Sequence, residues 1–484
     1  MIADNETKGL VLKYYKEIKM VTKETNKLGK GLFGGDVDMT SGPLPASLIT
    51  YAVPLIVTSM LQVLYTAADI AVVGNFASAV AVASIGATSA IINLLVNVFV
   101  NIATGANILL ARYRGAKDFG NLKKTISTSY TFSLILGVCI MLLGMTLAEP
   151  MLLLTKCPDN VMGGALLYMR IYMIGVPAAM FYNFMSCVLR SMGDSKRPFV
   201  YLSLSGVVNI VLNLLFVIGF GMDVEGVAIA TVVSQYLSAI LLFIRLVRFR
   251  DENRLSPLSF KLHGDSLKKV VRYGIPSAIS GASFSLSNIL IASAINSFGD
   301  YAISGNTAAG YIESIFLFSI TTPLMQTAAT FIGQNIGAGN RERTIKIARQ
   351  MYLYGGVFIA VIAALALVFD RQLLSLFIPG EDASIDFGII GLDMRLWFAI
   401  AFAALQISNG VMQAFGYTTY QMINSLFGIV GIRFLWMLVF YPLNPTPFML
   451  YVCYPITWCA SLLGSMPVAL VVLNKYRKGK NYKL

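Results

Sequence analysis

One acidic side chain lies deep inside an apolar run. Asp69 sits in the stretch Leu64-Tyr65-Thr66-Ala67-Ala68-Asp69-Ile70, with no basic residue nearby in the sequence. An unpaired carboxyl group in a low-dielectric environment binds a proton more readily than one in water. We therefore expect Asp69 to take up and release a proton. The alternative is a structural hydrogen bond from Asp69 to a neighbouring helix.

Neutral polar residues occur in the same half of the chain. Asn209 and Asn213 are four residues apart, so they share one face of a helix. Asn183 and Thr231 add an amide and a hydroxyl in two further apolar runs. These groups are expected to pair with Asp69 or to line a water-filled cavity. Alternatively, each one bonds two helices together.

In the second half of the chain, Glu313 lies inside another apolar run. We place Glu313 and Tyr65 as candidates for a substrate site or a second cation site. Asp393 lies near the end of an apolar run, where a solvated role is the alternative. Arg170 and Arg395 are expected to neutralise buried acids or helix ends.

Other chemistries find little support. His263 is the single histidine, and the five cysteines form no Cys-X-X-Cys pair, which argues against a zinc site, a disulfide framework or a His-based triad. The glycine-rich stretch 29–35 lacks the Gly-Lys-Ser/Thr ending of a phosphate loop. We expect no enzyme activity, no cofactor and no resident metal, although Asp69 is a possible Na⁺ ligand.

The composition indicates which elements carry these residues. Hydrophobic residues make up 56% of the 484 residues and charged residues only 13%, against about 45–50% and about 25% in soluble proteins. A membrane-spanning helix needs about 20 apolar residues. The sequence predicts twelve, with cores at 46–73, 80–111, 125–149, 161–189, 199–220, 226–244, 275–297, 305–335, 350–369, 389–413, 421–440 and 448–473. Pro54, Pro177 and Pro276 are candidate kinks.

The basic residues predict the orientation of these spans. Nearly all of the 37 Lys and Arg residues fall in the N-terminal segment, in alternate loops and in the C-terminal segment, whereas the opposite loops hold only Lys156 and Arg371. This bias places both termini in the cytoplasm. It also assigns the net charge of +13 to the cytoplasmic lipid leaflet rather than to nucleic acid.

Three matches in order indicate an internal repeat. Tyr51-Ala-Val-Pro54 resembles Tyr273-Gly-Ile-Pro276, Gly115-Ala116 resembles Gly337-Ala338, and Met169-Arg170 resembles Met394-Arg395, at offsets of 222 to 225. Six spans per repeat is an even number, so the repeats are related by an axis along the membrane normal. We predict a cytoplasmic tail or surface helix (1–45), an N-terminal lobe (46–244), a linker (245–274), a C-terminal lobe (275–473) and a basic tail (474–484).

These residues together resemble the MATE family of multidrug and toxic-compound exporters over about residues 39–475. The resemblance rests on Met39-Thr-Ser-Gly-Pro43, Tyr51–Pro54, Leu64–Gly74, Leu189–Asp194, Asn209–Asn213 and Gly333–Gly339. It implies an all-α protein of twelve helices in two six-helix lobes in a bacterial cytoplasmic membrane. It also implies efflux of cationic amphipathic compounds in exchange for H⁺ or Na⁺, with a monomer as the expected functional unit.

The resemblance further implies roles for individual residues. Asp69 matches the first-helix acid that binds the coupling cation, and Asn183, Asn209 and Thr231 match its polar partners in the DinF-like branch. This branch often has Asp where the chain has Asn213, so a site with two carboxylates is in doubt. The NorM-like acids of the seventh and tenth helices are absent here, since Phe284, Ser285 and Phe402 stand in those spans.

Three other functions remain open at this point. A flippase for a lipid-linked precursor belongs to the same superfamily, and Arg170, Arg395 and Arg433 inside spans keep it in consideration. A membrane-embedded prenyltransferase would need paired acids within a span, and the sequence shows none. A receptor or channel fits less well than a carrier with a six-plus-six repeat and one asymmetrically placed acid.

Overall fold

The computed structural model describes residues 37–76, 78–155, 157–248, 260–480 and 482. The compact unit begins at Asp38. The predicted surface helix of the first 45 residues falls mainly on residues 1–36, outside the described part of the chain.

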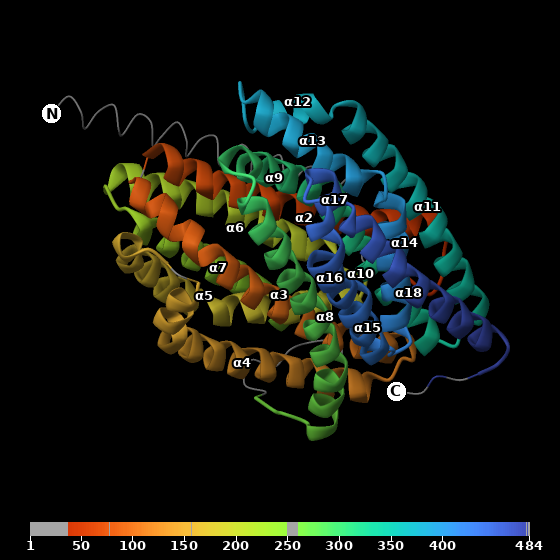
Figure 1. The fold of residues 1–484 in the computed structure, drawn as a ribbon. Coiled ribbons are helices and arrows are strands. Elements are labelled where there is room, and N and C mark those ends of the chain that lie inside the picture. The colour runs from red at the N-terminus through yellow and green to blue at the C-terminus, as the bar shows by residue number, and fades with distance from the viewer. Residues whose placement is uncertain (1–36, 77, 156, 249–259, 481, 483–484) are drawn as a thin grey trace. The chain divides into compact units, whose positions relative to one another are not determined.

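The N-terminal lobe consists of α2 to α7, which run from red to yellow-green on the left of Figure 1. Helices α5 and α6 are joined by a short turn, and α6 ends in a π-helical segment, η1. The bounds are α2 Leu44–Phe76, α3 Ala79–Gly115, α4 Phe119–Leu154, α5 Asp159–Ser191, α6 Lys196–Leu214, η1 Leu215–Gly219 and α7 Val224–Val247.

The C-terminal lobe follows, green to blue in Figure 1, and its helices are interrupted more often. The first part is α8 Gly264–Asn296, α9 Asp300–Glu313, η2 Ser314–Phe318, α10 Ser319–Gly337, α11 Arg341–Val368, α12 Asp370–Ser375, α13 Asp382–Leu396 and α14 Ala399–Ala414. The second part is α15 Thr418–Ser425, η3 Leu426–Gly431, α16 Ile432–Leu435, η4 Trp436–Phe440, η5 Tyr441–Leu443, α17 Pro447–Tyr451 and α18 Cys453–Arg477.

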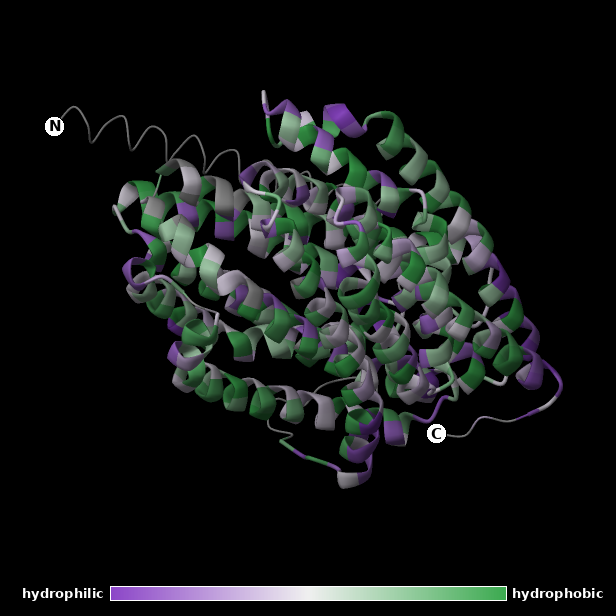
Figure 2. Ribbon diagram, viewed as in Figure 1, coloured by the Kyte–Doolittle hydropathy of each residue, from purple (hydrophilic) through white to green (hydrophobic). Residues whose placement is uncertain are grey.

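The predicted all-α fold is confirmed, and the described residues contain no strand. In the described part of the chain, eleven helices are long and apolar enough to cross a membrane, and the α13–α14 pair, bent by 48°, brings the number to twelve if it forms one span. Figure 2 shows hydrophobic residues along the helices and hydrophilic ones gathered toward their ends and the loops. This distribution is the one that a lipid environment requires, because charged groups are costly at membrane depth.

Two sequence-based boundaries differ from the structure. The predicted linker 245–274 is partly helical, because α8 already begins at Gly264; Val270 in its second turn is fully buried against the N-terminal lobe. In the predicted basic tail, α18 continues to Arg477. Helices α2, α5 and α8 continue through Pro54, Pro177 and Pro276, and kinks at these prolines stay a prediction.

The lobes cross closely where α3 meets α10. A methyl group on Gly115 would lie 1.8 Å from the backbone oxygen of Gln334, and one on Gly337 would lie 2.1 Å from the backbone oxygen of Arg112. These contacts are reciprocal, because the repeat offset of 222 relates Gly115 to Gly337 and Arg112 to Gln334. The repeat is therefore visible in the packing as an approximate two-fold axis between the lobes.

Hydrogen bonds surround this crossing at the end of the molecule that carries Arg112, Arg190 and Arg341, which we call the basic end. The Gln334 amide donates to the backbone oxygen of Ser191, and the Arg112 guanidinium donates to that of Ala414. Each bond joins one lobe to the other. The basic end is therefore closed in this structure.

Arg343 adds a clasp at the same end. Its guanidinium donates to the backbone oxygens of Met39, Ser41 and Gly42, just before α2. Asp38 holds this turn by accepting hydrogen bonds from Ser41 and Thr40, which lower the pKa of its carboxyl to about 2. Because the folded-state pKa is depressed, the contribution of Asp38 to stability is present above pH 3.8 and is lost only as the pH falls toward 2. The clasp is therefore insensitive to pH near neutrality.

Gly337→Ala tests the close crossing. The added methyl group overlaps a backbone oxygen, so the lobes must shift, and overpacking of this kind costs about 1–3 kcal/mol. We expect a melting temperature several degrees below that of the unmodified protein in detergent. Gly356→Ala is the matched control, because a Cβ there meets nothing within 4 Å and alanine favours the helix. Equal melting temperatures for the two variants would contradict the close crossing.

Candidate functional site

Tyr65 sets the distance between α2 and α6. Its hydroxyl donates to the backbone oxygen of Ser203 over 3.1 Å. Its ring lies on Gly206, where a Cβ would come within 2.1 Å of the ring. Both helices run in the same direction, so this contact brings Asp69, one turn further along α2, opposite Asn213 of α6. The predicted contact of Tyr65 with substrate stays a prediction, and its visible role is to position the acid.

Asp69 ends a chain of polar groups that links three helices. Asn213 Nδ2 donates to Asp69 Oδ1 over 2.6 Å. The same nitrogen lies 3.4 Å from Asn209 Oδ1, and Asn209 Nδ2 lies 3.5 Å from Thr231 Oγ1 on α7. The structure thus brings together Asp69, Asn209, Asn213 and Thr231. The first bond is short because its acceptor is a carboxylate, whereas the other two are at the limit of hydrogen-bond distance.

The site has a carboxylate with neutral oxygens around it. Asn213 is fully buried, and its Oδ1 finds no hydrogen-bond donor among the described residues. The Tyr168 and Tyr172 hydroxyls of α5 lie close enough to interact electrostatically with Asp69. No cluster of three His, Cys, Asp or Glu side chains occurs in the described ranges. A cation here would be bound by one carboxylate and uncharged oxygens, which suits a hard monovalent ion or a proton.

The structure places Asn183 elsewhere. Its Nδ2 donates to the backbone oxygen of Ala179 over 2.8 Å, and no hydrogen bond joins it to Asp69 in the described part of the chain. It lines a cavity of about 20 Å³ between the lobes, which has room for about one water molecule. Arg190 and Gln326, hydrogen-bonded across this cavity at 2.9 Å, make it part of the closed basic end.

A polar stripe on α3 continues from this cavity toward the other end of the protein. Ser89, Asn93, Asn97 and Asn101 recur every four residues and so share one face. Asn97 Nδ2 lies 3.5 Å from Ser285 Oγ of α8, so the stripe faces the C-terminal lobe. Asn93 and Asn97 are exposed. Exposed amides inside a span need polar surroundings, because lipid would leave them unsatisfied.

The charged residues of the C-terminal lobe form a different site. Glu313 Oε2 and Arg395 Nη1 are 2.5 Å apart and both side chains are buried, as expected for an arginine that neutralises a buried acid. Arg170, its repeat counterpart, is exposed. Asp393 is half-buried. The role of Glu313 in a substrate or second cation site stays a prediction.

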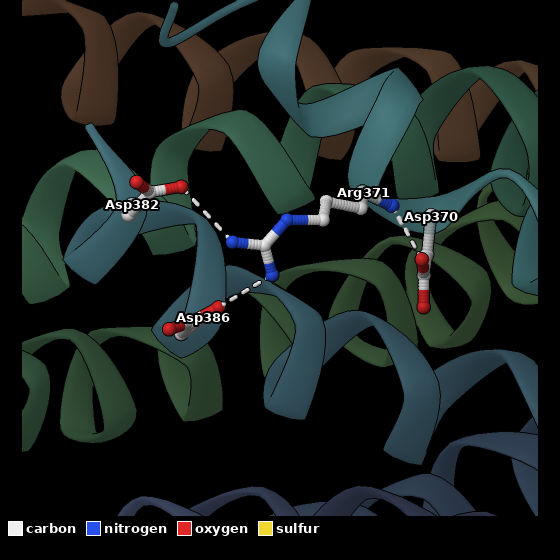
Figure 3. Close-up of polar contacts among 4 residues, drawn as sticks. All are labelled: Asp370, Arg371, Asp382 and Asp386. Atoms are coloured by element: carbon white, nitrogen blue, oxygen red, sulfur yellow. Dashed lines mark hydrogen bonds and ion pairs between the residues drawn. The ribbon is translucent and has the colours of Figure 1, made fainter. Parts of the chain in front are cut away.

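The end opposite the basic end carries its arginine within acidic surroundings. Figure 3 shows the Arg371 guanidinium between Asp382 and Asp386 of α13, at 2.9 and 2.8 Å. Asp370 also accepts a hydrogen bond from the Arg371 backbone. These exposed ion pairs add little stability, but they leave this end with a net negative charge. The charge asymmetry between the two ends is therefore larger than the count of basic residues alone indicates.

Comparisons with known proteins identify the family. The MatE family model matches residues 54–215 and 276–438, one segment in each lobe. The chain belongs to the MatE family. It is 30% identical to the "Probable multidrug resistance protein YoeA" of Bacillus subtilis over 80% of this chain and 85% of that protein. It is 28% identical to the "Probable multidrug resistance protein YpnP" of the same organism over 82% and 88%.

Solved MATE structures share the fold. The "Crystal structure of MATE in complex with MaL6" superposes with a TM-score of 0.84, at 19% identity, over 92% of this chain and all of that one. At this identity the likeness establishes the architecture of two six-helix lobes and leaves the residues of the site to be judged from the chain itself.

Sequence reasoning missed several polar residues of this MatE protein. The stripe from Ser89 to Asn101 has a period of four, which a search for polar faces inside spans would find. Arg433 was visible as a lone charge in an apolar run, but its partners, Ser287 and Asn288, lie about 145 residues earlier. Nothing in the local sequence connects them.

Asn213→Ala should impair the site more than Asn209→Ala. A hydrogen bond to a charged group contributes about 1.5–3 kcal/mol, so loss of the 2.6 Å bond is expected to lower ion-driven transport by about 10-fold or more. The bonds of Asn209 are at 3.4 and 3.5 Å, and its loss should matter less. Initial rates of dye transport in vesicles with equal protein levels measure both. A larger effect at Asn209 would contradict this geometry.

Proposed function

We propose that this MatE transporter is a secondary antiporter that exports amphipathic, mainly cationic compounds in exchange for H⁺ or Na⁺. The observation that carries the proposal is the Asp69 carboxylate, held in an apolar lobe by the neutral Asn213 amide. The names of the curated relatives, which mention multidrug resistance, support export of small foreign molecules. The bacterial relatives support a location in the cytoplasmic membrane.

The proposed orientation places the basic end in the cytoplasm. The Lys and Arg residues that surround Gly115 and Gly337 then lie on the side where positive charge is retained. In this orientation the structure is closed toward the cytoplasm, and the polar stripe of α3 extends from the closed end toward the outside. An ion then approaches Asp69 from outside in this state. Substrate binds in the alternative conformation of the transporter.

The proposed coupling needs no direct contact between ion and substrate. A cation on Asp69 neutralises the carboxylate and changes its bond to Asn213, so the two conformations of the transporter bind the ion with different affinities. Substrate then biases the same equilibrium in the opposite direction. One elementary charge that moves through 100 mV supplies about 2.3 kcal/mol, to which an ion concentration gradient adds.

Asp69→Asn tests the proposal in everted vesicles with H⁺ and Na⁺ gradients imposed separately. The amide cannot bind a proton and carries no charge, so we expect gradient-driven efflux of a cationic dye to fall to background. Asp159→Asn is the control, since Asp159 is an exposed acid at the start of α5, and it should transport normally. Full activity of Asp69→Asn, at normal membrane insertion, would refute the role of the acid.

A lipid-linked-precursor flippase is the second candidate. The buried Arg395 and Arg433 favour it, because a guanidinium binds phosphate well. The same vesicles distinguish the two functions. A flippase would move a fluorescent phospholipid-type precursor between leaflets and would not accumulate a water-soluble dye.

A further inference from the structure

The interior of the C-terminal lobe holds more positive than negative charge. Arg395, Arg433 and Glu313 come from three different helices, and they are 3%, 0% and 5% exposed. Glu313 bonds to Arg395, as described above, whereas Arg433 Nη1 donates to Ser287 Oγ at 2.9 Å and Asn288 Oδ1 at 2.7 Å. The cluster thus contains two guanidiniums and one carboxylate, so its net charge is +1.

Several donors of this cluster have no acceptor. Arg433 Nε and Nη2 and Arg395 Nη2 are buried and find no hydrogen-bond partner among the described residues. The guanidinium carbons of Arg433 and Arg395 lie 4.5 and 5.4 Å from the centre of the same Tyr454 ring. The ring offsets part of the charge through its face, but it does not accept the in-plane N–H groups. A buried guanidinium without acceptors is costly, so this arrangement calls for an oxyanion beside Tyr454.

The position of Arg433 corresponds to that of the cation site in the other lobe. In the N-terminal lobe, Asp69 on the first helix bonds to Asn213 on the fifth, 144 residues apart. In the C-terminal lobe, Asn288 on the first helix bonds to Arg433 on the fifth span, 145 residues apart. The repeat therefore preserves the helix-to-helix bond and reverses the charge at the site from negative to positive.

Irregular helix geometry marks both positions. The π-helical segment η1 begins two residues after Asn213, and η3 and η4 flank the short α16 that carries Arg433. A third π-helical segment, η2, follows Glu313. Such segments are frequent at functional sites, because they re-aim side chains within a helix.

The cluster adjoins the face of α8 that packs against the polar stripe of α3. Gly274, Gly281 and Ser285 of α8 contact α3, and Asn288 continues this face at helical spacing. Asn288 is half-buried, so it is the accessible edge of the cluster. Phe284, one turn earlier, lies 5.9 Å from the Arg433 guanidinium carbon and packs edge-on against Phe318. The neighbourhood therefore suits an oxyanion carried on an aromatic group.

We propose that Arg433, together with Arg395, binds the carboxylate or phosphate group of an aromatic amphipathic substrate in the C-terminal lobe. This inference rests on the proposed export function. It adds zwitterionic compounds, which carry both a cation and an oxyanion, to the proposed substrates. A guanidinium binds an oxyanion through paired hydrogen bonds, whereas an uncharged ester gains much less from it.

Two dyes with one scaffold test the proposal on the purified full-length protein. Rhodamine 110 carries a free carboxylate, and rhodamine 123 is its methyl ester. Fluorescence anisotropy should show that Arg433→Gln weakens binding of rhodamine 110 by about 10-fold or more, as expected for a lost charged hydrogen bond, and binding of rhodamine 123 by less than about 2-fold. Arg170→Gln, at the exposed repeat-matched arginine, should change neither. An equal loss for both dyes, or no binding of rhodamine 110 to the unmodified protein, would overturn the proposal.

A variant that should strengthen binding separates a role in binding from a role in folding. Glu313→Gln removes the internal carboxylate that competes for Arg395, so binding of rhodamine 110 should strengthen while that of rhodamine 123 stays the same. A purely structural cluster would weaken both. Competition identifies the source of the oxyanion: displacement of rhodamine 110 by benzoate supports a substrate group, whereas displacement only by short-chain phosphatidylglycerol would assign the site to a lipid phosphate and overturn the substrate.

The failure of this inference differs from that of the export function. Asp69→Asn should abolish gradient-driven transport of both dyes in proteoliposomes, while Arg433→Gln should still weaken binding of rhodamine 110 selectively in the Asp69→Asn background. Transport that survives Asp69→Asn contradicts the proposed function. An equal effect of Arg433→Gln on both dyes contradicts only the anion site.

Discussion

The high free energy of a charge inside an apolar helical lobe shapes this protein. Each lobe meets this constraint with a bond between its first and fifth spans, and each meets it incompletely. Asp69 is matched by the neutral Asn213 amide rather than by a cation. Arg433 is matched by Ser287 and Asn288, and two of its nitrogens have no acceptor in the described part of the chain. Sites that lack a counter-charge in the resting fold are the ones that can exchange ions and ligands.

The close crossing of α3 and α10 joins the two lobes. Gly115 and Gly337 let the two helix backbones pack in direct contact. The surrounding hydrogen bonds are donated by the side chains of Arg112, Arg190 and Gln334. The bonds donated by the two arginines contribute about 1.5–3 kcal/mol each, and the neutral bond of Gln334 contributes about 0.5–1.5 kcal/mol. Each bond at the closed end is therefore of the same order as the about 2.3 kcal/mol that one elementary charge gains across 100 mV.

The sequence predicted those features that depend on local pattern. The spans follow from runs of apolar residues, and the Asn209–Asn213 pair from a spacing of four on one helix. The repeat located Gly115 and Gly337 before any contact was known. What could not be predicted is which faces of different helices meet. Asn183 shows this, because its position on α5 was correctly polar and inside a span, yet the helix turns it toward Gln326 of the other lobe rather than toward Asp69.

Divergence of the two repeats also limited the sequence-based prediction. A search for a second acid at offset 222 from Asp69 finds Ile291, because the C-terminal lobe keeps the interaction but not the residue type. In the C-terminal lobe the first helix contributes the neutral Asn288, and the fifth span contributes the charged residue, Arg433, whose charge is opposite to that of Asp69. In a transporter built from two repeats, the informative comparison is therefore between pairs of contacting helices rather than between aligned residues. One duplicated framework can then hold a cation in one lobe and an anion in the other without any change in the way the lobes cross.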